Sequence, residues 1–162
     1  GAVGGCAAFS LFVESNNQRG TPPVSPESFQ VMESLIPDAG MGLFCATEEP
    51  LPKGAFLFPY DGEILTEDEY FQRYPTGQGR YVAEVPTFAG EPVYIDGANP
   101  DRSGLARWMN SKPIEEANVE WRKQSFGSEA GSMYFYASRD ISKGVELTFD
   151  YGSSYWDAVG EE

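Results

Sequence analysis

Histidine is absent from this 162-residue chain, and cysteine occurs only twice, as Cys6 and Cys45. Two cysteines without a histidine do not supply the four ligands of a structural zinc site, so we expect no zinc and no other metal. They make no disulfide framework either, which predicts a reducing compartment and a core position for Cys45. The fold is therefore expected to depend on an apolar core.

Basic residues are also scarce. The chain has 11 lysines and arginines against 25 acidic residues, which leaves a net charge of −14. Proteins that bind nucleic acid need cations to neutralise phosphates, so no direct nucleic-acid binding is expected. The charge favours a basic protein or peptide as the partner. Acidic surfaces also keep many proteins soluble, and composition does not separate that explanation from electrostatic steering of a basic partner.

Long apolar runs are missing as well. No stretch approaches the roughly 18 apolar residues of a membrane span, and the mildly apolar residues 1–13 lack the basic start of a signal peptide. We therefore expect no membrane association. With 41% hydrophobic and 14% aromatic residues, the chain is long enough for one well-packed domain and short for two.

Segments with strand character recur at short intervals between 18 glycines and 12 prolines, a pattern typical of a mostly β domain built from small sheets. One helix is predicted to begin after Thr66, whose hydroxyl can cap the first turn while Glu69 reaches back. A second short helix is predicted over residues 103–109. The predicted strands are 29–32, 43–46, 56–60, 81–85, 93–95, 119–121, 133–137 and 147–149.

Composition divides the chain into three parts. Residues 1–26 form an N-terminal extension, with a strand over residues 9–13 and then a polar, flexible connection. Residues 27–157 form the main domain, and residues 158–162 form an acidic tail. One globular domain with two short extensions is the expected organisation.

The main domain contains a weak internal echo. Residues 46–54 and 137–144 both end in Lys-Gly, and they lead to Tyr60 and Tyr151 respectively. Lys-Gly turns are common, so the echo is either chance or a pair of related strand-turn-strand units.

Four short segments carry most of the chemical information: AGMGLF at 39–44, YDGE at 60–63, ARWMN at 106–110 and ELTFDYG at 146–152. The Gly-x-Gly of the first segment lacks the third glycine and the strand-loop-helix frame of a dinucleotide-binding fingerprint. It lies between two predicted strands, where small residues let main-chain groups approach a ligand. We interpret it as a backbone cradle for another nucleoside cofactor.

In order and spacing, the four segments resemble the SET-domain protein lysine methyltransferases, over roughly residues 29–155. The resemblance implies a SET domain with β-clip-like small sheets, few short helices and a C-terminal pseudoknot. In that pseudoknot the last strand passes under the loop that follows Asn110, which places Asn110 and Tyr151 side by side. Both Lys-Gly units are then expected, since each precedes a strand that delivers a tyrosine to the active site.

The resemblance also implies S-adenosylmethionine as the cofactor and Tyr151 as the catalytic residue. The expected lysine channel is lined by Tyr60, Trp121 and Phe149, although core packing is the simpler explanation for any one aromatic residue taken alone. The expected cofactor-binding residues are Ala39, Gly40, Met41, Gly42, Tyr81, Arg107, Met109, Asn110, Ser111 and Trp156.

The implied reaction is methyl transfer to a lysine ε-amine of a basic protein, with a histone tail as the expected substrate. The amine attacks a methyl group in line, so the protein must supply aim and a dry channel. Burial lowers the pKa of the lysine, and its proton can pass to water. Tyr151 would orient the amine and stabilise positive charge through its oxygen. A nuclear location follows by resemblance, and a cytoplasmic one stays open.

One segment departs from the family pattern. The usual Asn-His-Ser-Cys-x-Pro-Asn is replaced by Asn110 and SKPIEEAN at 111–118, with Ser111 in the histidine position and two extra residues. PR domains, a divergent branch, also lack this histidine, and some of them only bind partners. A catalytically inactive PR/SET-like module that binds a peptide or protein is therefore the alternative. The edge of a predicted hairpin over residues 81–95 offers pairing for an extended peptide in either case.

Overall fold

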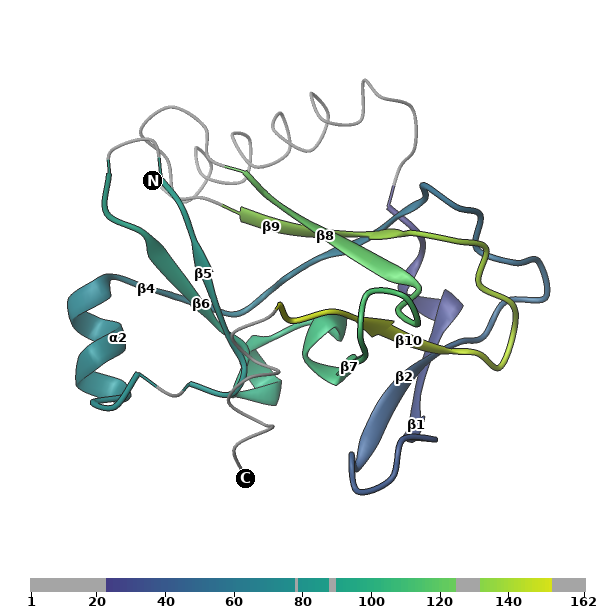
Figure 1. Cartoon of the computed structure of the whole chain (residues 1–162), viewed down its shortest axis with the longest axis horizontal. Helices are drawn as coiled ribbons and strands as arrows, with labels where there is room; N and C mark the ends of the chain where they lie inside the picture. The colour runs from purple at the N-terminus through teal and green to yellow at the C-terminus, as the bar shows by residue number, and fades with distance from the viewer. Residues whose placement is uncertain (1–22, 78, 88–89, 125–131, 153–162) are drawn as a thin grey trace.

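The computed structural model describes residues 23–77, 79–87, 90–124 and 132–152 (Figure 1). Strands dominate this part of the chain, which confirms the expected mostly β class. The strand predicted over residues 9–13, Trp156 and the acidic tail lie outside the described residues. In chain order the elements are η1 (Pro26–Ser28), β1 (Phe29–Glu33), β2 (Met41–Cys45), β3 (Phe56–Pro59), β4 (Glu63–Leu65), α2 (Glu67–Arg73), β5 (Val82–Val85), β6 (Val93–Asp96), η2 (Pro100–Arg102), η3 (Leu105–Trp108), β7 (Asn110–Ser111), β8 (Val119–Gln124), β9 (Ser132–Ala137) and β10 (Glu146–Phe149).

The strands predicted within the main domain are all present, with ends that differ by a few residues. The short strands β4 and β7 were not predicted, because three and two residues show no alternating pattern. The short helix predicted over residues 103–109 is present as the 3-10 helix η3, over the shorter range Leu105–Trp108. Gly104 before it and Met109 after it have extended backbones, which mark its two ends.

The strands of the described residues form two sheets. The larger has seven strands in the order β1-β2-β10-β8-β9-β3, with β7 paired to β10, and the smaller has three in the order β4-β6-β5. Figure 1 shows the small sheet and α2 at one end of the molecule and the β1–β2 hairpin at the other, with β10 between them. The last strand of the described chain therefore lies at the centre of the fold.

The core fills the space between these sheets. Leu43 of β2 pairs with Leu147 of β10, and both side chains are fully buried. Phe135 of β9 is equally buried and packs against rings from β3 and β10. Burial of large apolar side chains is the main stabilising term of such a domain. Among the described residues, no helix is long and apolar enough to cross a membrane.

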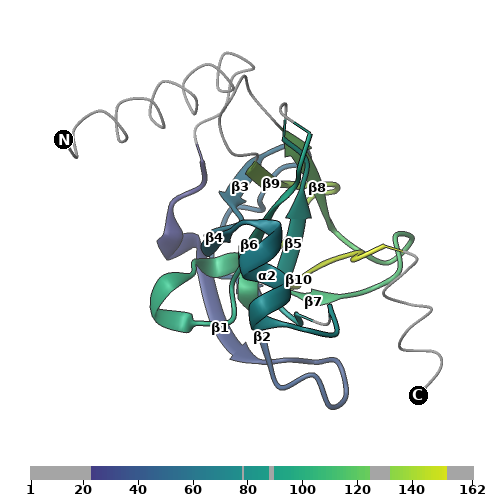
Figure 2. The same ribbon diagram turned by 90° about the vertical axis from the view of Figure 1, so that its left-hand side faces the viewer.

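Helix α2 begins as predicted. The backbone N–H of Glu69 donates to the hydroxyl of Thr66, and the carboxylate of Glu69 accepts from the backbone of Thr66, which completes a capping box. The turned view in Figure 2 shows α2 lying over the small sheet. Tyr70 on the buried face of α2 stacks on Tyr94 of β6, with ring centroids 4.1 Å apart.

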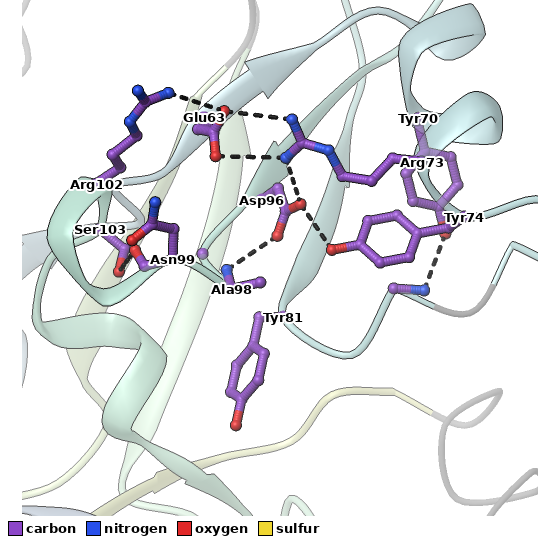
Figure 3. Close-up of polar contacts among 12 residues, drawn as sticks. Glu63, Tyr70, Arg73, Tyr74, Tyr81, Asp96, Ala98, Asn99, Arg102 and Ser103 are labelled. Carbon is purple, nitrogen blue, oxygen red and sulfur yellow. Dashed lines mark hydrogen bonds and ion pairs between the residues drawn. The ribbon is translucent and has the colours of Figure 1, made fainter.

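A buried carboxylate, Asp96, joins α2 to the end of β6 (Figure 3). It accepts hydrogen bonds from Arg73 (2.9 Å), Tyr74 (2.8 Å) and the backbone N–H of Ala98 (2.9 Å). Burial, and then the hydrogen bond to Asp96, raise the pKa of Tyr74 to about 12. The network holds the chain that leaves β6 toward η2, and this chain continues directly into the site described below.

The two Lys-Gly units contact each other. Leu51 and Ile141 exchange two backbone hydrogen bonds of 2.8 Å, and the N–H of Gly54 donates to the carbonyl of Ala137 at 2.7 Å. Gly54 and Gly144 both have a positive φ, near +88° and +83°, which favours glycine at these turns. The two units thus form similar glycine turns that pair with each other in the fold.

Candidate functional site

The C-terminal strand β10 is threaded between two segments far from it in the sequence. It runs parallel to β7, with Thr148 opposite Asn110, and parallel to β8, with Phe149 opposite Val119. Backbone bonds from Lys112 and Asn118 to carbonyls of β10 close the intervening loop over it. This is the crossing expected from the sequence, and it sets Asn110 beside the strand that leads to Tyr151.

Tyr151 is held at both ends. Its backbone N–H donates to the hydroxyl of Ser111 at 3.2 Å, and its phenol donates to the carbonyl of Met109 at 3.2 Å. Ser111 therefore supplies a brace between the two crossing segments from the position where the family pattern has histidine. The Met109 side chain is buried in the core, so its carbonyl is the part of the residue that reaches Tyr151.

Asn118 forms a second brace, which sequence reasoning recognised only as the end of the acidic loop. The side chain is buried. Its amide nitrogen donates to the carbonyl of Glu146 at 2.9 Å, and its amide oxygen accepts from the N–H of Thr148 at 2.9 Å. One side chain thus forms hydrogen bonds with two main-chain groups of β10, as a neighbouring strand would.

The proposed glycine cradle lies at the turn from β1 into β2. Gly40 has φ near +74°, a conformation that favours glycine, and its missing Cβ would face open space. Gly42 is required for a different reason. A Cβ there would lie 2.5 Å from the Oε2 atom of Glu146 and 3.3 Å from the Nδ2 atom of Asn110. The sequence interpretation attributed both glycines to ligand approach, whereas Gly42 makes room for a buried carboxylate of the protein itself.

Glu146 was missed as a site residue. It is 8% exposed, and its carboxylate accepts from the hydroxyl of Ser34 (2.7 Å), the N–H of Leu35 (2.9 Å) and the amide of Asn110 (3.0 Å). The amide of Asn110 also donates to the carbonyl of Met41 at 2.9 Å. The sequence did offer one signal for Glu146, which is a charged residue at the start of an apolar strand. Charged residues are rarely buried unless they have specific partners.

Arg107 and Tyr81 contact each other. The Arg107 guanidinium donates to the carbonyls of Gly97 (2.8 Å) and Ala98 (3.4 Å), and it lies over the ring of Tyr81 at 4.8 Å. The carbonyl of Tyr81 in turn accepts from the phenol of Tyr60. Burial raises the pKa of Tyr60, so this phenol stays a donor. Arg107 therefore acts within the protein as a clamp on the chain leaving β6.

Two of the three aromatic residues expected to line a lysine channel, Tyr60 and Phe149, belong to one connected series of rings. Ring centroids lie 6.1 Å apart between Tyr60 and Phe135, 5.0 Å between Phe135 and Phe149, and 4.5 Å between Phe149 and Tyr151. Phe135 was missed because its alternating strand pattern indicates only core, and the residue is indeed fully buried. The series links Tyr60 and Phe149 to Tyr151.

Trp121 lies at the edge of this group. It is 38% exposed, and its indole N–H donates to the carbonyl of Asp150 at 2.9 Å, next to Tyr151. The ammonium group of Lys123, two residues along β8, lies 4.9 Å from the Trp121 ring centroid. Burial lowers the pKa of Lys123. The indole therefore already attracts a lysine of the protein itself, which is the kind of contact expected of a channel wall.

The structure thus brings together the predicted residues from four segments. Met41, Gly42, Asn110 and Ser111 belong to β2 and β7, which both pair with β10, and Tyr81 contacts both Tyr60 and Arg107. Ala39 and Gly40 lie at the turn before β2, where the N–H of Ala39 bonds to the carbonyl of Ile36. The Met41 side chain is 46% exposed. Trp156 is outside the described residues, so its role stays a prediction.

Comparison with known proteins identifies relatives of this arrangement. Residues 40–152 match the SET domain family. The histone-lysine N-methyltransferase set-17 of Caenorhabditis elegans is 29% identical over 142 residues, which cover 88% of this chain and 47% of set-17. The probable inactive histone-lysine N-methyltransferase SUVR2 of Arabidopsis thaliana is 30% identical over 131 residues, 70% of this chain and 17% of SUVR2.

A solved structure gives the same result for the fold. A humanized mutant of the Chaetomium thermophilum Polycomb Repressive Complex 2 bound to the inhibitor GSK343 is similar with a TM-score of 0.62 and 26% identity, over 83% of this chain and 16% of that chain. The chain spans less than half the length of each of these three relatives.

Proposed function

Because the chain belongs to the SET-domain family, we propose that it transfers a methyl group from S-adenosylmethionine to the ε-amine of a lysine in a basic protein. The observation that carries the proposal is the position of Tyr151. Its phenol is held by the Met109 carbonyl at the crossing of β10 and β7, between the Asn110 cradle and the aromatic series ending at Phe149.

The residues of the cradle fit such a cofactor. The open side of Gly40 and the polar amide of Asn110 lie close together, because Asn110 donates to the carbonyl of Met41. Small residues and main-chain groups of this kind suit the amino-acid end of the cofactor. When bound, the cofactor supplies an electrophilic methyl group on a sulfonium. Ala39, Gly40, Met41, Asn110 and Ser111 would hold it, and Tyr81, Arg107 and Trp156 would support its remaining parts.

The protein's own residues would then guide and orient the lysine. Tyr60, Trp121 and Phe149 would line the path of its stem, as aromatic faces attract an ammonium group and exclude water. A dry path lowers the pKa of the lysine and favours its neutral, nucleophilic form, with the proton released to water. Tyr151 donates its own proton to Met109, so its oxygen lone pairs are oriented to accept from the amine.

The charge of the chain supports a basic substrate. A net charge of −14 raises the local concentration of lysine-rich segments and speeds their encounter. The relative set-17 is named a histone-lysine N-methyltransferase, so a histone tail is the first substrate to test. A nuclear location is part of the same proposal. Strand β5 forms one edge of the small sheet, where an extended peptide can pair.

The test is calorimetric titration of the purified protein with S-adenosylhomocysteine, followed by radiolabelled methyl transfer to mixed histones. We expect micromolar binding to the wild-type protein and loss of that binding in Asn110→Ala. The exposed variant Glu49→Gln serves as the control for correct folding and handling. Absence of binding at millimolar ligand would refute the proposed activity.

A second function is favoured by one observation. Ser111 replaces the histidine of the family pattern, and SUVR2, which is similar over 70% of this chain, is named as probably inactive. A module that binds a peptide without catalysis would keep the pseudoknot and the edge of β5 while binding no cofactor. The same titration separates the two functions, since only an enzyme requires the cradle to be occupied.

A further inference from the structure

Glu146 has an unusual position for a carboxylate. It is buried on the central strand β10, and its three donors come from the loop after β1 and from Asn110 on β7. Among the described residues, no salt bridge reaches it. A buried charge without an opposite charge is costly unless hydrogen bonds compensate, so the fold must gain something specific from it.

What Glu146 determines is the direction of the Asn110 amide. Its Nδ2 atom lies 2.9 Å from the carbonyl oxygen of Met41 and 3.0 Å from the Oε2 atom of Glu146. Both partners are acceptors only, so the NH₂ end of the amide must face them, and the reverse orientation would set oxygen against oxygen. The Oδ1 atom consequently points away from this pair and presents an acceptor.

The same carboxylate fixes the position of the segment that leads into the cradle. Its bonds to Ser34 and to the N–H of Leu35 tie the segment before Gly40 to β10, across 112 residues of sequence. The close approach is possible because residue 42 is glycine, whose Cβ would otherwise lie 2.5 Å from Oε2. One side chain thus sets both the position of the cradle and the polarity of its amide.

We propose that Glu146 is a positioning residue that orients Asn110 so that the cradle presents an acceptor to the protonated amine at the amino-acid end of the cofactor. This proposal rests on the proposed function. The negative charge of Glu146, which forms no salt bridge within the described part of the chain, favours a cationic group in the same place. A ligand without the amine loses both the hydrogen bond to Oδ1 and this attraction.

The first part of the test needs no cofactor. Hydrogen exchange of the Asn110 side-chain amide is measured by NMR in the free protein and in Glu146→Gln. With both protons bonded, exchange in the wild-type protein should be slow. Glutamine keeps only one acceptor oxygen for the donors that share the two oxygens of Glu146, so exchange in Glu146→Gln should be faster. Glu49→Gln makes the same change of charge at an exposed site and should leave the exchange unchanged.

The second part compares ligands by calorimetry. S-adenosylhomocysteine and its analogue lacking the α-amino group are titrated into wild-type, Glu146→Gln, Asn110→Ala and the double variant. We expect Glu146→Gln to weaken S-adenosylhomocysteine at least about tenfold and to abolish the preference over the analogue. Because Glu146 acts mainly through Asn110, the loss of affinity in the double variant should be smaller than the sum of the two single losses.

Each outcome decides the matter. Unchanged amide exchange in Glu146→Gln, or additive losses in the double variant, would overturn the positioning role and leave the proposed methyl transfer intact. Failure of the wild-type protein to bind S-adenosylhomocysteine would overturn the proposed function instead, together with any role of Glu146 toward the cofactor. Should Glu146→Gln not fold, Asn110→Ala alone still tests the acceptor, and an unchanged preference of that variant for S-adenosylhomocysteine over the analogue would refute the argument.

Discussion

Replacement of Asn118 by alanine should lower the stability of the protein more than replacement of any other polar residue in the loop over residues 111–118. The side chain makes two buried hydrogen bonds to the main chain of β10, each 2.9 Å long. Its removal leaves the carbonyl of Glu146 and the N–H of Thr148 without these partners, and each buried polar group left unsatisfied costs about 1–3 kcal/mol. We therefore expect a loss of about 3 kcal/mol in the free energy of unfolding.

That loss is large against the total stability of about 5–15 kcal/mol typical of a domain, yet it leaves the protein folded. Urea denaturation followed by circular dichroism measures it, with the slope of the transition as a check that the unfolded state is unchanged. Ser111→Ala is the matched control. It removes one hydrogen bond of 3.2 Å at a half-buried position and should cost below about 1 kcal/mol. Equal losses in the two variants would refute Asn118 as the main brace.

The remaining predictions concern catalysis, the cradle and alkaline pH. Tyr151→Phe should lower the rate of methyl transfer about 100-fold or more while S-adenosylhomocysteine binding, measured by calorimetry, changes little; a retained rate would refute the role of the phenol oxygen. Gly42→Ala should weaken that binding and lower the melting temperature, because the new Cβ would lie 2.5 Å from the Glu146 carboxylate; unchanged values for both would contradict the close approach. Because the pKa of Tyr74 is raised in the folded state, its protonated phenol contributes fully to stability below the unfolded pKa near 10. This contribution is lost as the pH rises toward 12. Tyr74→Phe should therefore flatten the fall of the unfolding free energy between about pH 10 and 12, measured by urea denaturation at several pH values, and an equally steep fall would count against it.

Local signals predicted the elements of this fold well. The capping box at Thr66 and Glu69 depends only on residues within one turn of helix, and it is present in the structure. The strands of the main domain follow from alternation and from the turns that bound them. Where the local signal was too short, as at β4 and β7, no strand was predicted, and the short helix predicted before Met109 formed as the shorter 3-10 helix η3.

The site was only partly accessible to the same reasoning. Tyr151, Asn110 and Gly40 stand in motifs with characteristic spacing, so they could be named from the sequence. The roles of Glu146 and Asn118 could not be predicted, because their hydrogen-bond partners lie 28 to 112 residues away in the sequence. Nothing near either residue in the sequence indicates those partners.

By itself, the sequence determined the class of fold, most of the strands and the family to which the chain belongs, because these depend on periodicity, turn residues and motif spacing. Only the tertiary structure decided that Gly42 accommodates Glu146, that Ser111 bonds the backbone of Tyr151 and that Arg107 clamps the carbonyls of Gly97 and Ala98. The physical reason is the threading of β10 between β2, β7 and β8. Hydrogen bonds across that crossing depend on which residues lie close together in space, and the separation of two residues in the sequence does not indicate this.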